Sequence, residues 1–151
     1  MNPIRPSRSS RIAIVVSTYN SNITGKLRDG AVETLRAHGF AEQQIEICEV
    51  PGAWELPLAA VQFAEQPDVV GVITLGAVIR GETTHDQHIN RAVSSALMDL
   101  MMRTKKPVGF GLLTCNTLEQ AIHRSGGNVG NKGEETASAV LKVLGLQYEQ
   151  E

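Results

Sequence analysis

The sequence predicts a three-layer α/β/α sandwich, in which helices cover both faces of a four-stranded, mainly parallel sheet. Two observations support this fold class. Four short segments are rich in β-branched and other apolar residues, as expected of strands buried on both faces. They alternate with longer segments whose apolar residues recur every three or four positions, the spacing of amphipathic helices. Strict alternation implies right-handed crossovers, and therefore strands that run in the same direction.

The predicted strands are the four apolar segments, and they span residues 11–17, 45–50, 69–79 and 108–114. The third, Val69 to Ile79, is the longest and is uniformly apolar, which predicts a central position in the sheet. With helices on both faces, this arrangement is of the flavodoxin-like kind. In such sheets ligands bind at the carboxyl ends of the strands, so the strand-to-helix loops are where we expect functional residues.

The predicted helices carry apolar residues at helical spacing, and they run from Asn22 to about His38, from Trp54 to about Glu65, from Ile89 to about Met101, from Asn116 to about Arg124 and from Gly133 to about Leu144. Asn22 is predicted to cap the first helix, and Asn116 with Glu119 to form a capping box for the fourth. Gly145 is predicted to end the last helix, which follows a glycine-rich turn over residues 126–133.

The length of 151 residues fits one domain. We expect a flexible amino-terminal arm over residues 1–10 and a single domain over residues 11–151. The formal net charge is −2 without a block of like charges, which argues against nucleic acid or an anionic membrane as a partner.

The longest apolar segment is too short to span a bilayer, and the arginine-flanked start resembles a signal peptide only superficially. A cytoplasmic location is therefore predicted. Cys48 and Cys115 lie far apart without CxxC spacing, so we expect both to be reduced.

Three of the six aromatic residues lie in or just after predicted strands: Tyr19, Trp54 and Phe110. A ring in a strand-end loop can stack on a flat heterocycle, whereas a core ring normally lies on the inner face of a helix. Local packing beneath a loop is the alternative for each ring taken alone.

The segment Arg80 to Asp86 places hydroxyl groups and free N–H groups before the third helix, an arrangement that attracts phosphate. A simple helix cap by Thr83 or Thr84 is the alternative. His85 and His88 are three positions apart and could hold a metal with Glu82 or Asp86, but no further ligand has suitable spacing. We therefore expect no metal, and we interpret His85 as a proton carrier.

The segment Gly126 to Gly133 does not match the phosphate loop GxxxxGK[ST], and it follows a helix rather than a strand. Arg124 and Lys132 flank this segment and could supply positive charge to a phosphate. Two solvated surface cations are the alternative.

Taken together, four motifs resemble the lumazine synthase family: residues 17–20 (STYN), 51–57 (PGAWELP), 75–85 (LGAVIRGETTH) and 130–133 (GNKG). The resemblance runs in order from about Arg11 to Leu146. Tyr19 stands where phenylalanine is more usual in the family. Asp86-Gln87-His88 stands where aromatic residues often follow the histidine.

The resemblance implies a transferase of riboflavin biosynthesis that condenses 5-amino-6-(D-ribitylamino)uracil with 3,4-dihydroxy-2-butanone 4-phosphate to 6,7-dimethyl-8-ribityllumazine, releasing phosphate and water. It implies no metal and no organic cofactor. The residues that it places on the pyrimidine and its ribityl chain are Tyr19, Asn20, Ala53, Trp54, Glu55, Ala77, Val78, Ile79 and, from a neighbouring subunit, Phe110. Those that it places on the butanone phosphate are Glu82, Thr83, Arg124 and Lys132, with His85 as the catalytic proton-transfer residue.

The resemblance further implies a homo-oligomer, either a pentamer or a larger assembly built from pentamers, up to a hollow icosahedral shell. Riboflavin synthase is a candidate partner. Two alternatives remain at this point: a flavodoxin-like module that binds a flavin-like heterocycle without turnover, and an inactive shell-forming scaffold. A phosphorelay receiver is excluded, because the third strand ends in Ala77-Val78-Ile79 and lacks an acceptor aspartate.

Overall fold

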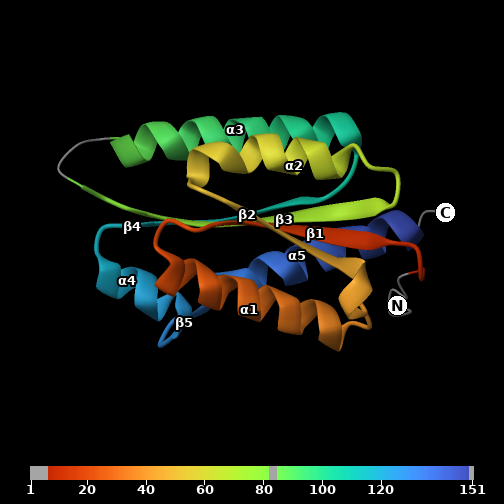
Figure 1. Cartoon of the computed structure of the whole chain (residues 1–151), viewed down its shortest axis with the longest axis horizontal. Helices are drawn as coiled ribbons and strands as arrows, with labels where there is room; N and C mark the ends of the chain where they lie inside the picture. The colour runs from red at the N-terminus through yellow and green to blue at the C-terminus, as the bar shows by residue number, and fades with distance from the viewer. Residues whose placement is uncertain (1–6, 82–84, 150–151) are drawn as a thin grey trace.

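The computed structural model describes residues 7–81 and 85–149, and its centre is one four-stranded sheet. Its strands are β1 (Arg11–Ser17), β2 (Ile45–Val50), β3 (Val69–Ile79) and β4 (Val108–Cys115). The strands lie in the order β2-β1-β3-β4, and each neighbouring pair is parallel. Figure 1 shows this sheet from its edge, between two layers of helices. The predicted strands are confirmed, with β4 extending one residue further than expected.

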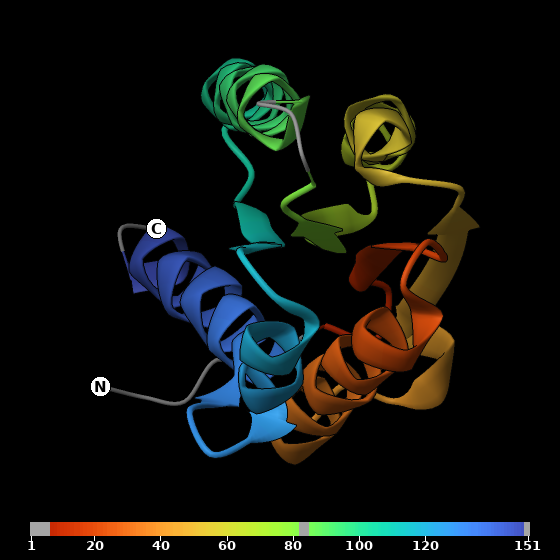
Figure 2. The same cartoon turned by 90° about the vertical axis from the view of Figure 1, so that its left-hand side faces the viewer.

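Helices cover both faces of the sheet, which confirms the three-layer sandwich (Figure 2). On one face lie α2 (Leu56–Ala64) and α3 (His85–Thr104); on the other lie α1 (Ser21–Ala37), α4 (Leu118–His123) and α5 (Lys132–Glu149). Two short 3-10 helices, η1 (Glu42–Gln44) and η2 (Ala53–Glu55), precede β2 and α2. In the described part of the chain, no helix has the length and apolar character needed to cross a membrane.

The core lies in two layers because successive residues of a strand point to opposite faces. Ile12, Ile14 and Val16 of β1 pack with α1 and α5 in one hydrophobic cluster. Ala13 and Val15 pack with α2 and α3 in the other. All five are buried, which explains why β1 is apolar at consecutive positions rather than at alternate ones.

Several predicted helix boundaries are wrong, and α3 begins at His85 rather than at Ile89. Asn22 lies inside α1, and the residue before the helix is Asn20, in the left-handed conformation with φ 62°. The α4 cap is Thr117, whose hydroxyl accepts a hydrogen bond from the Gln120 N–H at 3.2 Å, instead of Asn116. Gly145 lies inside α5, because a glycine one turn from a helix end is tolerated when the helix packs against a neighbour.

The segment predicted as a glycine-rich turn contains a small antiparallel hairpin, β5 (Ser125–Gly127) with β6 (Gly130–Asn131). Asn131 caps α5, since its Oδ1 accepts hydrogen bonds from the Gly133 and Glu134 N–H groups at 2.8 and 3.2 Å. A Cβ on Gly133 would lie 1.9 Å from the carbonyl oxygen of Leu27, so only glycine allows α5 to approach α1 this closely. Much of the GNKG motif is therefore structural.

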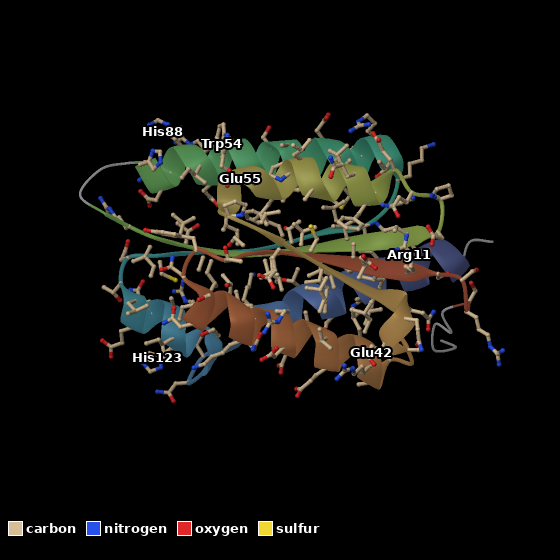
Figure 3. The ribbon with its side chains drawn as sticks, viewed as in Figure 1. Arg11, Glu42, Trp54, Glu55, His88 and His123 are labelled. Carbon is tan, nitrogen blue, oxygen red and sulfur yellow. The ribbon has the colours of Figure 1, made fainter. Side chains whose placement is uncertain are left out.

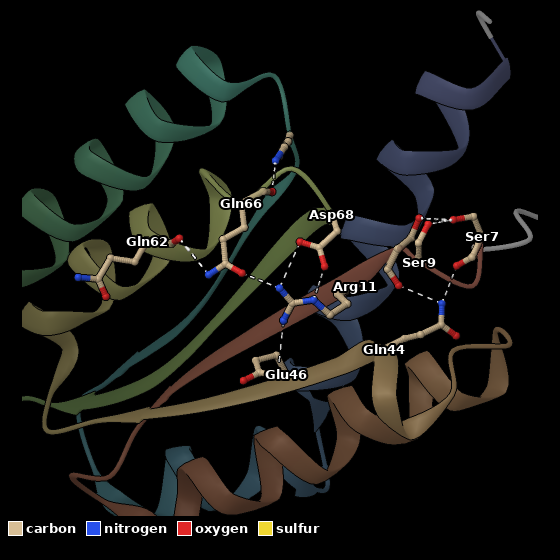
Figure 4. A network of polar contacts seen from close by, with 10 residues as sticks. Ser7, Ser9, Arg11, Gln44, Glu46, Gln62, Gln66 and Asp68 are labelled. Carbon is tan, nitrogen blue, oxygen red and sulfur yellow. Dashed lines mark hydrogen bonds and ion pairs between the residues drawn. The ribbon is translucent and has the colours of Figure 1, made fainter.

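A polar network joins the amino ends of the strands (Figure 4). The Arg11 guanidinium donates to both oxygens of Asp68, at 2.6 and 3.2 Å, and also contacts Glu46 at 3.5 Å. These contacts lower the pKa of Asp68, chiefly through the Arg11 hydrogen bond, and raise that of Arg11. Lys106 Nζ donates to the carbonyls of Ala64 and Gln66 at 2.7 and 2.9 Å, so it supplies hydrogen-bond donors to carbonyl groups at and just after the end of α2.

The predicted arm, residues 1–10, is described only from residue 7 onward; residues 1–6 lie outside the described range. Gln44 Nε2 donates to the carbonyls of Ser7 and Ser10 at 2.7 and 2.9 Å. Ser10 is buried. Residues 7–10 are thus attached to the turn before β2.

Candidate functional site

A cavity of about 420 Å³ opens at the carboxyl ends of the central strands. The loops after β1 and β2, the end of β3 and the start of α3 all contribute to it. The lining residues are Tyr19, Gly52, Ala53, Trp54, Ala77, Val78, Ile79, Gly81, His85, Asp86 and Ile89. Seven of the residues predicted for the site therefore lie together: Tyr19, Ala53, Trp54, Ala77, Val78, Ile79 and His85. We refer to it as the aromatic cavity.

Tyr19 and Trp54 present their rings to solvent at the rim of the aromatic cavity, and 75% and 64% of their surfaces are exposed. The chain holds both rings in place through the backbone. The N–H groups of Thr18 and Tyr19 donate to the carbonyls of Val50 and Pro51, at 2.8 and 3.0 Å. Because these rings are exposed, they add little to the hydrophobic core. Because their loops are held by hydrogen bonds, the rings are suitable stacking surfaces for a flat ligand.

Asn20 and Glu55, both predicted site residues, are not among the lining residues but are the chain neighbours of Tyr19 and Trp54, and both make hydrogen bonds to the backbone. Asn20 Nδ2 donates to the carbonyl of Ala77 at 3.1 Å, which ties the loop after β1 to the end of β3. Glu55 Oε1 accepts from the Gly52 N–H at 3.0 Å and so shapes the turn that carries Trp54. Part of the role of each residue is therefore to position its neighbours.

The first turn of α3 supplies two ionisable side chains. His85, the predicted proton carrier, is exposed and lines the cavity. Asp86 also lines it but is buried, with 7% of its surface exposed. Glu82 and Thr83, the predicted phosphate ligands in the preceding loop, lie outside the described residues.

The structure does not bring the predicted cations into the aromatic cavity. Arg124 and Lys132 line a second cavity of about 340 Å³, formed with the end of β4 and the start of α5. Arg124 Nη1 donates to Cys115 Sγ at 3.7 Å, and Glu135 is the acidic residue of the lining. We call this the cationic cavity.

Phe110 also lies apart from the aromatic cavity, on the edge strand β4. Its ring is 38% exposed although its strand neighbours Gly109 and Gly111 are buried. Within one chain, the predicted pyrimidine contacts and the predicted cations thus occupy two different places.

Sequence analysis missed Asp86 as a cavity residue, although a signal was present. The buried residues of α3 include Val93, Leu97 and Leu100, which follow helical spacing. Stepping back seven positions from Val93 leads to Asp86, on the same helix face. The predicted pattern began at Ile89 and therefore started one turn too late.

His85 and His88 were considered as metal ligands. Among residues 7–81 and 85–149, no group of three or more histidine, cysteine, aspartate or glutamate side chains is placed to hold a metal ion. Figure 3 shows His88 and Trp54 on the layer of α2 and α3, whereas His123 lies on the opposite layer.

Comparison with known proteins gives a consistent result. The family model described as 6,7-dimethyl-8-ribityllumazine synthase matches residues 9–147. A protein of that name from Rhodopirellula baltica is 56% identical over 139 residues, which cover 92% of this chain and 90% of the relative. One from Thermus thermophilus is 41% identical over 97% of this chain and 93% of its own. One from Pediococcus pentosaceus is also 41% identical, over 91% of this chain and 88% of its own length.

Proposed function

This chain belongs to the 6,7-dimethyl-8-ribityllumazine synthase family, and we propose that its two cavities divide the family's two substrates between them. The enzyme is a transferase of riboflavin biosynthesis. It condenses 5-amino-6-(D-ribitylamino)uracil with 3,4-dihydroxy-2-butanone 4-phosphate, and releases phosphate and water. The observation that carries the division is the separation of stacking rings from cations within one chain.

The aromatic cavity is the proposed pyrimidine site. Tyr19 and Trp54 offer exposed ring faces to a planar heterocycle. Ala77, Val78 and Ile79 pair with β4 but lie beyond the last pair between β1 and β3, at Leu75. Their backbone groups on the β1 side, other than the Ala77 carbonyl that Asn20 binds, are proposed to meet the edge of the ring. Asn20 and Glu55 hold the loops of this site through their hydrogen bonds to the backbone. Glu55 is also proposed to accept hydrogen bonds from the ribityl hydroxyls.

His85 is the proposed proton-transfer residue. A primary amine attacks a ketone to give an imine, phosphate departs, the enol tautomerises, and a second carbonyl closes the ring. Each of these steps moves protons, which a histidine side chain can accept and return. Because His85 lines the aromatic cavity, it lies beside the proposed position of the amine. Much of the rate should come from holding both substrates together.

Arg124 and Lys132 are proposed to hold the butanone phosphate and to stabilise the phosphate as it leaves. A guanidinium binds phosphate oxygens with two parallel hydrogen bonds, whereas an ammonium acts as a point charge. Glu82 and Thr83 remain predictions for the same substrate.

We further propose a homo-oligomer in which a neighbouring chain brings its cationic cavity and its Phe110 to the aromatic cavity. Phe110 lies on the edge strand with its ring exposed, where another subunit can reach it. A pentamer satisfies this head-to-tail contact by closing into a ring. Sedimentation or electron microscopy would distinguish a pentamer from a larger shell. Contact with riboflavin synthase and a cytoplasmic location remain predictions.

The direct test of the function is to mix the purified protein with both substrates and to follow lumazine absorbance together with phosphate release. We expect equal amounts of both products. Binding of the pyrimidine without either product would instead support a heterocycle-binding module.

The division between subunits can be tested by mixing two inactive variants. In a hetero-oligomer of His85→Ala and Arg124→Ala chains, some contacts pair an intact His85 with an intact Arg124. Random mixing at equal amounts should restore about a quarter of the wild-type activity above the two variants alone, because such pairs form at about one contact in four. Absence of any recovery in confirmed hetero-oligomers would place both residues in one subunit's site.

A further inference from the structure

One charged side chain in the aromatic cavity has no assigned role. Asp86 is more than nine-tenths buried, lines the cavity and lies in the first turn of α3. Its Oδ1 atom is one of two buried side-chain atoms in the described part of the chain that lack a hydrogen-bond partner. Most buried polar atoms in proteins are paired, so this oxygen requires an explanation.

Packing does not explain the choice of aspartate. The position shares a helix face with Val93 and Leu97, which are buried against the sheet. An apolar side chain there would continue the hydrophobic layer, whereas a carboxylate loses solvation without gaining a protein donor. The amino end of α3 favours a negative charge, but it supplies no hydrogen bond to Oδ1. A ligand donor would complete the missing contact.

We propose that Asp86 Oδ1 accepts a hydrogen bond from an N–H group of the aminopyrimidine substrate and so fixes the orientation of its ring. This inference rests on the proposed function. The pyrimidine carries several N–H donors and no phosphate. The butanone phosphate is an anion, which a buried carboxylate repels, and the cations that suit it line the other cavity. Asp86 thereby acts as a specificity residue for the uncharged, donor-rich substrate.

Two substitutions of Asp86 test this assignment. Asp86→Leu removes the acceptor and substitutes a larger apolar side chain with the same branching, and Asp86→Asn keeps the shape while removing the charge. For Asp86→Leu we expect the KM for the pyrimidine to rise about ten-fold or more. The rise should be smaller for Asp86→Asn, because its amide oxygen still accepts a hydrogen bond but without the charge that strengthens it. The KM for the butanone phosphate should change little. Calorimetric titration with the pyrimidine alone should show the same weakening.

Thermal unfolding of the ligand-free protein separates this role from a structural one. If Asp86 serves the ligand, Asp86→Leu should unfold at the same temperature as the wild type or higher, because it removes an unpaired buried acceptor. Asp99→Asn, an exposed aspartate on the same helix, is the matched control and should leave both KM values unchanged.

Several results would overturn the assignment. Unchanged pyrimidine binding in both variants would do so, as would a larger effect on the butanone phosphate or a lower unfolding temperature with unchanged KM values. These results differ from failure of the proposed function, in which the wild-type protein itself forms no lumazine.

Discussion

The two ends of the sheet differ in whether their polar and aromatic side chains have partners within the protein. At the amino end, Arg11, Asp68 and Lys106 bond to the protein itself. At the carboxyl end, Tyr19 and Trp54 expose their rings and Asp86 Oδ1 has no partner within residues 7–81 and 85–149. Figure 3 shows Arg11 and His88 toward opposite ends of the molecule.

This difference separates residues that support the fold from residues that are available to ligands. Paired polar groups contribute to stability and leave nothing for a substrate to bind. Exposed rings contribute little to stability and an unpaired buried acceptor lowers it, so both are the groups proposed to contact ligands. Substitutions at the amino end should therefore change stability, and those at the carboxyl end should change activity.

The largest effect on activity is expected for Arg124→Ala. Loss of a charge-assisted, bidentate phosphate contact should lower kcat/KM for the butanone phosphate by about 100-fold, while pyrimidine binding is much less affected. Steady-state kinetics with each substrate varied in turn measures this. Arg103 is an exposed arginine near the amino end of the sheet, and Arg103→Ala is the control. It should leave kcat/KM for both substrates unchanged. Equal losses for both substrates would indicate a structural role for Arg124.

A smaller effect on activity is expected for His85→Ala. Removing acid–base assistance should lower turnover about ten-fold or more, with unchanged thermal unfolding. His38→Ala, an exposed histidine at the end of α1, is the comparison and should retain full turnover. Wild-type turnover in His85→Ala would remove this residue from the mechanism.

The smallest effect, on stability alone, is expected for Asp68→Asn. The Arg11 hydrogen bond lowers the pKa of Asp68 below its ordinary value of 3.8. A lowered carboxylate pKa contributes stability above that ordinary value, and the contribution disappears as the pH falls through the lowered value. The variant should unfold slightly below the wild type at neutral pH, and the difference should close below about pH 4. Activity should be normal in this variant.

The sequence predicted the sheet well because burial on both faces leaves a strong pattern. In both Arg11–Ser17 and Val69–Ile79, apolar residues follow one another almost without interruption. Such short segments are typical of strands that are covered by helices on both faces. Helix ends were harder to predict, because several neighbouring residues are able to cap a helix and local contacts decide which one does. Asn22 is a residue type that often caps helices, yet the chain turns at Asn20, whose side chain bonds to Ala77 on the neighbouring strand β3.

The candidate site was predictable in part for a related reason. Loops that follow neighbouring parallel strands must meet at one edge, which brings Tyr19, Trp54 and His85 together. Arg124 and Phe110 belong to elements near the edge strand, and no pattern within one chain states what a second copy places beside them. Asp86 was overlooked because an acidic residue next to a histidine suggested a ligand set rather than a buried position.

The hydrogen bond from Asn20 to Ala77 has a practical consequence. It anchors the backbone on which the Tyr19 ring stands, independently of the ring itself. Exchanging Tyr19 for other aromatic or aliphatic side chains should therefore alter the contact surface while the corner keeps its path. The position is a suitable starting point for engineering the protein to accept heterocycles other than its own.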